Sequence, residues 1–231
     1  MPPPVSPHVA TAAHGAIATP TRAAPLAEPA QALDPATLVV GDNPQYPTLD
    51  MRLTEMQARR NGEPFDAKQA LAALQQPSAW QADDSVAEQL QLSAEERYDG
   101  RSFIRFNALK VETLMPGDTL EIPVQQANGT YRMLVENVEA HGDGSVTWRG
   151  TLQDFPKENQ VMITQSKGIT SGGIFTPDAP YVLQAHGEAG WIASTATLFK
   201  GEDTHLQLPP GVSGAPAAPH DHSSHDHGAA N

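Results

Sequence analysis

The chain has 231 residues and a net charge of -13 at neutral pH, with 14 Lys and Arg against 27 Asp and Glu. This length accommodates one domain of ordinary size with additional segments at its ends. The acidic balance, with no basic cluster beyond Arg59 and Arg60, excludes a nucleic-acid-binding face and disfavours binding to an anionic membrane surface. The absence of cysteine excludes disulfides, cysteine–zinc sites and thiol catalysis.

Residues 1–45 are rich in Ala, Pro and Thr and contain almost no large apolar side chain before residue 38. Such a segment cannot bury enough apolar surface to offset the entropy of ordering its backbone, so we predict a disordered linker. No run of 18 apolar residues is long enough to span a membrane. Three prolines directly after Met1 suggest that an upstream anchor or signal is missing, so we expect membrane attachment only through an N-terminal anchor absent from this sequence.

Residues 46–100 change to a helical pattern and are predicted to form a helical preamble. Apolar residues at helical spacing precede Asn61 and Gly62, which end the first predicted helix. Asp66 is a candidate N-cap for a second helix over Ala67–Gln76, which Pro77 terminates. A third, weaker pattern covers Asp84–Leu92, with Asp84 as its candidate cap. Helices this short are marginal alone and must pack on a domain or a partner.

Residues 101–208 contain about ten short runs rich in Val, Ile, Thr and aromatics, separated by turn residues. Asn128 and Gly129 lie between two alternating runs and predict a β-hairpin. Ser102–Leu109 is predicted as a strand, and Ser171–Gly173 as a tight turn between strands. The fold class predicted is mainly β, an antiparallel sandwich or barrel with a short helical N-terminal preamble and disordered ends.

The central strands resemble the prodomain-like β module of bacterial reprolysin-type zinc metallopeptidases. The residues that carry the resemblance are Gly144–Gly150, Val161–Thr164, Gly173–Asp178, Tyr181–Leu183 and the pair Gly190-Trp191. The resemblance covers roughly residues 103–195. The chain contains no His-Glu-x-x-His motif, so it carries no catalytic domain of that family.

A stand-alone module of this kind resembles the dedicated chaperones of metallopeptidases exported by type II secretion. The resemblance therefore implies a non-enzymatic chaperone or detached prodomain that clasps a secreted zinc metallopeptidase and keeps it inactive. It also implies a periplasmic location, with anchoring in the inner membrane, and the alternative is a secreted protein.

Residues 209–231 form the predicted flexible tail, which ends in a His/Asp-rich run. Four histidines, His220, His222, His225 and His227, offer imidazole nitrogens that suit zinc, nickel or copper. A flexible run has no preformed geometry, so any binding is expected to be weak and no cofactor is required. The alternatives are a solvated low-complexity tail and a periplasmic metal-handling protein that acts through this tail.

Aromatic residues in the central strands are candidates for the core or for a partner surface. Packing between strands is the expected role of Trp148, Phe155, Tyr181 and Trp191. The alternative is that Trp148, Phe155 and Trp191 anchor a partner, as buried aromatics do at interface hot spots.

His141 and His186 each lie beside a glycine, so we interpret both as turn residues rather than metal ligands. No nucleophile with a neighbouring base is evident, and a hydrolase with an unrecognised site is the least favoured hypothesis.

Overall fold

The computed structural model describes residue 34 and residues 38–198. The chain divides into two units, Met1–Asp34 and Pro35–Asn231, and all the elements below lie in the second. The α-helices are α1 (Leu49–Arg59), α2 (Ala67–Leu74), α3 (Ala94–Tyr98), α4 (Ala108–Glu112) and α5 (Thr195–Leu198). The 3-10 helices are η1 (Asp84–Gln89) and η2 (Gln125–Ala127). The strands are β1 (Trp80–Ala82), β2 (Ser102–Phe106), β3 (Thr119–Val124), β4 (Gly129–Ala140), β5 (Val146–Leu152), β6 (Gln160–Ser166), β7 (Ile169–Phe175), β8 (Pro180–His186) and β9 (Ala189–Ser194).

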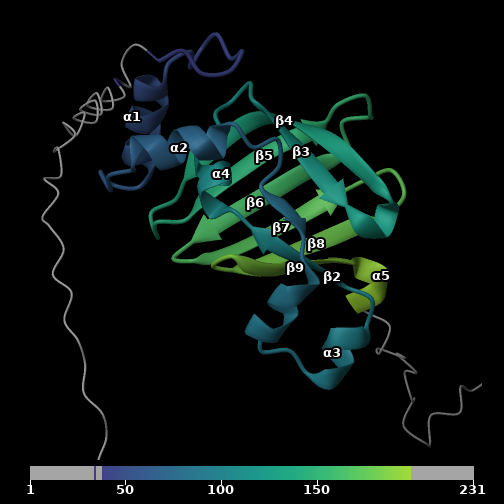
Figure 1. Cartoon of the computed structure of the whole chain (residues 1–231). Helices are drawn as coiled ribbons and strands as arrows, with labels where there is room; N and C mark the ends of the chain where they lie inside the picture. Colours follow the sequence, from purple (N-terminus) through teal and green to yellow (C-terminus); the bar gives the residue numbers. More distant parts are fainter. Residues whose placement is uncertain (1–33, 35–37, 199–231) are drawn as a thin grey trace, which may run out of the picture. The chain divides into compact units, whose positions relative to one another are not determined.

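Within residues 38–198, nine strands form one antiparallel sheet that curls into a nearly closed barrel (Figure 1). Its order is β1-β2-β9-β8-β7-β6-β5-β4-β3, so β3 to β9 form a meander and β2 adds on at β9. The two ends of the sheet meet where Ser78 forms a parallel bridge with Glu121. The Glu121 amide donates to the Pro77 carbonyl at 2.9 Å, and Trp80 Nε1 donates to the Pro123 carbonyl at 3.0 Å. The predicted fold class is confirmed, and of its two forms the chain adopts the barrel.

Alternating apolar residues fill the barrel interior with side chains. Strand β6, for example, alternates exposed and buried positions, and β3 does the same. The interior includes Trp148, Ile104, Leu120, Ile122 and Met133, each 0% exposed. The Trp148 indole also donates to the Leu114 carbonyl at 3.3 Å, which satisfies its polar atom. The interior is therefore a packed core.

Glycines inside the strands allow this curvature. A Cβ atom on Gly150 would lie 2.0 Å from the Leu134 carbonyl oxygen, at the place where the β4–β5 register shifts. A Cβ atom on Gly172 would lie 2.7 Å from the Met162 carbonyl oxygen. The expected tight turn at Ser171–Gly173 is wrong, because these residues lie inside β7 and the glycines serve the close approach of neighbouring strands.

Local signals placed the first hairpin correctly and extended the strand before α4 too far. The predicted hairpin is present: β3 pairs with β4, and Asn128 at the turn has a left-handed φ of 52°. The strand expected over Ser102–Leu109 ends at Phe106, because the Asn107 side chain accepts from the Lys110 amide at 3.2 Å and caps α4.

The N-terminal helices begin at residues that the sequence favours as caps. Thr48 caps α1, and Asp66 caps α2 by accepting from the Gln69 amide at 2.8 Å. The third predicted helix is the 3-10 helix η1, and its cap is Asp83 rather than Asp84. Strand β1 lies inside the stretch predicted to be helical, so the sheet begins before residue 101.

A buried ion pair attaches α1 to the barrel. Arg52 is 1% exposed, and its Nη1 and Nη2 atoms lie 2.5 Å and 2.9 Å from the two carboxylate oxygens of Asp118. Arg52 also donates to the carbonyls of Tyr46 and Thr113. Asp118 accepts further bonds from the Met115 amide and from the Asn43 side chain. The pair is therefore fully hydrogen-bonded, which offsets the cost of its burial.

The C-terminal end of α1 covers the end of the barrel. Arg59 donates to the carbonyls of Glu112 and Leu114, and its guanidinium lies 5.6 Å from the Trp148 ring centroid. Arg60 pairs with the Glu112 carboxylate and donates to the Gly144 carbonyl at 2.7 Å. These contacts join the end of α1 to α4, and Figure 1 shows α1, α2 and α4 grouped on one side of the barrel.

A second apolar cluster covers the outer face of β2 and β9. Val86 and Leu90, in and just after η1, pack with Phe103, Trp191 and Ala193. This explains why an outward-facing tryptophan in β9 is only 9% exposed.

Replacing Trp148 with alanine should lower the free energy of unfolding by about 3–5 kcal/mol, because the largest side chain of the core leaves a cavity. The matched control is Phe155→Ala: that side chain is 41% exposed, so the change should be below about 1 kcal/mol. Urea unfolding followed by circular dichroism measures both. Equal losses for the two variants would contradict this account of the core.

Replacing Arg52 with methionine should cost about 3–5 kcal/mol, because it leaves the Asp118 carboxylate buried without its cation. The double variant Arg52→Met, Asp118→Leu should be less destabilised than the sum of the single variants. A double-mutant cycle in urea tests this, and additive losses would show that the two residues do not act as a pair.

Candidate binding cleft

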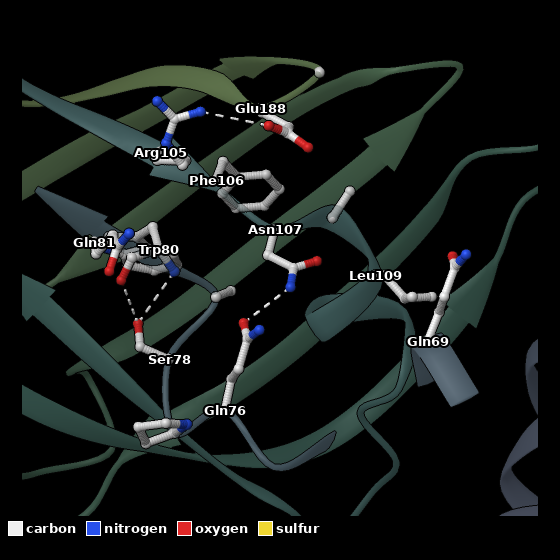
Figure 2. A pocket seen from close by; sticks show the side chains of 14 residues that line it. Gln69, Gln76, Ser78, Trp80, Gln81, Arg105, Phe106, Asn107, Leu109 and Glu188 are labelled. Atoms are coloured by element: carbon white, nitrogen blue, oxygen red, sulfur yellow. Dashed lines mark hydrogen bonds and ion pairs between the residues drawn. The ribbon is translucent and has the colours of Figure 1, made fainter. Parts of the chain in front are cut away.

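The main candidate site is a cleft of about 860 Å³ outside the barrel. Three segments that are distant in sequence line it: the stretch from α2 through its following loop to β1, the end of β2 with the start of α4, and the β8–β9 turn (Figure 2). Its volume lies in the range of pockets that bind ligands. The closure of the sheet at Ser78 and the cap at Asn107 position these segments side by side.

The base of the cleft is apolar. Trp80 and Phe106 stack with their ring centroids 6.2 Å apart and their planes at 18°, and both are buried. Pro77 and Leu109 add apolar surface nearer the opening. The aromatic pair is also part of the core, so the base is rigid.

Primary amides surround the opening. Gln69, Gln76 and Gln81 are exposed and Asn107 is half-buried. Asn107 Nδ2 donates to Gln76 Oε1 at 2.9 Å, and Figure 2 shows these two side chains pointing toward each other. Each amide can donate and accept, so together they can bond to the N–H and C=O groups of another chain.

The charged residues of the cleft are already paired. Arg105 Nη2 lies 2.7 Å from Asp83 Oδ2, and its Nη1 lies 3.5 Å from Glu188 Oε2. The pKa of Asp83 is lowered, first by the hydrogen bond from the Ser85 side chain and then by Arg105. The carboxylate of Asp83 is therefore held ionised and is a poor general acid.

The backbone amide and carbonyl of Trp80, at the start of β1, are both hydrogen-bonded to the Ser78 side chain. Ser78 Oγ donates to the Trp80 carbonyl at 3.0 Å and accepts from the Trp80 amide at 3.2 Å. This engages the hydroxyl in a local turn. Among the residues that line the cleft, no nucleophile lies beside a base, so the arrangement suits binding and not covalent chemistry.

A buried lysine lies behind the cleft. Lys110 is 4% exposed, and its Nζ donates to the Leu74 carbonyl at 3.1 Å, which joins α4 to α2. Burial lowers the pKa of Lys110 from 10.5 to about 8; the charge of Asp118 opposes this shift and that of Arg52 adds to it.

The predicted partner-binding aromatics do not come together. Trp148 is fully buried in the barrel, so its proposed role as a surface anchor is wrong. Trp191 lies under η1, with the Arg101 guanidinium 4.6 Å from its ring centroid. Phe155 is exposed beside Tyr131, at 5.8 Å between centroids. Roles of Phe155 and Trp191 in partner binding stay predictions.

The predicted metal ligands His220, His222, His225 and His227 lie outside the described residues. Within the described part of the chain, no group of three or more His, Cys, Asp or Glu could hold a metal ion. His141 Nε2 lies 2.9 Å from Thr147 Oγ1, and His186 ends β8 on the exposed side of the sheet.

Sequence reasoning did not find the cleft. Its lining comes from residues that are far apart in the chain and carry no motif. The one local signal was Asn107 followed by good helix formers, which marks a helix cap at the cleft. No helix in the described residues is long and apolar enough to cross a membrane.

The structure is a small antiparallel barrel with a filled interior and an external cleft. The chain belongs to the family of the BamI lipocalin-like domain, whose model matches residues 75–199. A solved structure described as "Structure of a chaperone-substrate complex" is similar to 57% of this chain and 91% of that chain, with 20% sequence identity and a TM-score of 0.45. A comparison with curated proteins gives no match.

The family match corrects the resemblance drawn from the sequence. The prediction of a metallopeptidase prodomain module is wrong, because the matching family is a lipocalin-like domain. The secreted zinc metallopeptidase partner and the type II secretion route rested on that resemblance alone and are withdrawn with it. The family agrees with the coarser prediction of a binding protein rather than an enzyme, and it is compatible with a periplasmic location.

Replacing Lys110 with methionine removes a buried ammonium but also the donor to the Leu74 carbonyl, so the stability of the variant relative to the unmodified chain should be highest at pH 7. The pKa of Lys110 is lower in the folded chain than in the unfolded chain. The free-energy cost of burying its ammonium group is therefore fully present below pH 8 and disappears as pH rises toward 10.5. The stability of the variant relative to the unmodified chain should therefore fall over that window. Urea unfolding at pH 7 to 10.5 measures it, with the exposed Lys68→Met as control; a pH-independent difference would contradict the prediction.

Proposed function

We propose that this domain is a non-enzymatic, chaperone-like binding protein that holds an extended segment of a partner polypeptide in the cleft. The observation that carries the proposal is the lining: primary amides at the opening over a rigid apolar base. Amides pair with peptide groups in either direction, so they favour a polypeptide backbone over a particular side chain.

The filled interior supports an external site. The barrel core is occupied by buried side chains, among them Trp148 and Met133, so a ligand enclosed in the barrel would have to displace the core. The cleft binds without that cost. The net charge of -13 also favours partners that carry positive charge.

The proposed location is the periplasm. The finer proposal is attachment to the inner membrane through an N-terminal anchor, and the alternative is a secreted protein. Metal handling by the tail histidines is the second function that the sequence suggests. It stays a prediction, because those residues lie outside the described part of the chain.

Binding of a permanently unfolded polypeptide, such as a fluorescent protein fragment with reduced and blocked thiols, tests the proposal. Gln69→Trp places a bulky ring in the cleft and should weaken binding at least about tenfold, a loss of about 1.4 kcal/mol. Gln75→Trp is the matched control, because Gln75 is exposed at the end of α2 but does not line the cleft. Fluorescence anisotropy gives the affinities, and thermal unfolding confirms that both variants fold.

Two results would refute the proposal. One is the absence of saturable binding by the unmodified chain. The other is an equal affinity for the two tryptophan variants, which would place binding outside the cleft.

A further inference from the structure

A second pocket, of about 440 Å³, adjoins the cleft. It lies between the connection from α1 to α2 and the β6–β7 turn. Ala108 and Gly187 line both hollows, so the pocket and the cleft share a wall. An extended chain in the cleft would pass the opening of the pocket.

Two buried oxygens at this pocket have no hydrogen-bond partner. They are Glu112 Oε2 and Gln165 Oε1, and both residues line the pocket. Glu112 is 7% exposed and Gln165 is 5% exposed. An unpaired buried acceptor costs about 1–3 kcal/mol, and more for a charged group. A donor placed in the pocket would recover part of that free energy.

Neither oxygen has a donor among the described residues, and both are covered, so a side-chain rotation is needed to expose them to the pocket. The other Glu112 oxygen, Oε1, accepts from Arg60. This bond fixes the orientation of the carboxylate and leaves Oε2 without a donor. Gln165 is held by a single long bond, from Nε2 to the Ala108 carbonyl at 3.3 Å. A small rotation of Gln165 therefore breaks little and can bring its oxygen to a ligand.

The pocket has no dominant charge. Its lining includes two basic residues, Arg60 and Lys167, and two acidic residues, Glu63 and Glu112. The two oxygens that lack a hydrogen-bond donor, more than the charge of the pocket, therefore select the ligand. Acceptors without donors select a group that ends in N–H.

We propose that the pocket is a subsite for a side chain that ends in an N–H donor and projects from the polypeptide held in the cleft. This inference rests on the proposed function for the origin of the ligand. The donor chemistry is shared by primary amides and by primary ammonium groups, and the pocket is open to both.

Small probes test the subsite on the unmodified full chain, independently of polypeptide binding. The probes are propionamide and n-butylammonium, each compared with its methylated analogue, N,N-dimethylpropionamide and n-butyltrimethylammonium. Each analogue keeps the alkyl chain and the charge but has no N–H and carries a larger head group, so the Gln165→Met comparison below separates the loss of hydrogen bonds from the added size. NMR chemical shifts of the Gln165 side-chain amide and of the Gly168 and Gly187 backbone amides report on the pocket.

At least one N–H probe should give saturable shifts at these groups, and its methylated analogue should bind at least about tenfold more weakly. The probe that binds identifies the source, amide or amine. Equal shifts from the analogue, or shifts from none of the four probes, would overturn the proposal and leave the acceptors to water.

Gln165→Met removes one of the two acceptors at similar volume and should weaken the response of the Gly168 and Gly187 amides to the probe at least about threefold. The matched control is Gln184→Met, an exposed position on β8 outside both hollows, which should keep the response. An unchanged response in Gln165→Met would also overturn the subsite. Failure of the proposed function appears instead in the unfolded-polypeptide assay, where these small probes play no part.

Discussion

The buried pair of Arg52 and Asp118 is the interaction on which the rest of the domain depends. A single α-helix of 11 residues is marginal in water, so α1 needs a fixed attachment to stay on the barrel. The pair provides it where the Met115–Asp118 turn leads into β3, with every polar atom engaged. Once α1 is fixed there, Arg59 and Arg60 reach α4 and the barrel end, and α4 in turn supports the cleft.

The functional surfaces follow from how the barrel is closed and filled. The loop after α2 closes the sheet at Ser78 and Glu121, and the same loop supplies one wall of the cleft. Closure and the candidate site therefore depend on the same backbone. Because the interior is packed with side chains, the function that we propose uses the outside of the barrel, where Ala108 and Gly187 line both hollows.

The family match, set beside the incorrect resemblance, shows that strand patterns in a sequence indicate the fold class better than the family. The match begins at residue 75, after α1 and α2. Both helices therefore lie outside the matched region, including α1, which Arg52 attaches to the barrel. The motifs that suggested a peptidase prodomain lie in β5 to β9 and are alternating strands joined by short turns. Many antiparallel domains satisfy the same periodicity, so these motifs indicate the fold class but do not identify the family.

The sequence by itself determined the local structure: the caps at Thr48 and Asp66, the hairpin at Asn128 and the alternation that makes the domain mainly β. These depend on residues within a few positions of one another, where side-chain and backbone preferences decide. Tertiary structure alone decided the barrel over the sandwich, the Arg52–Asp118 pair and both hollows. Each joins segments that are distant in the chain, and no local preference encodes which distant partner a side chain meets when the sheet curls and closes.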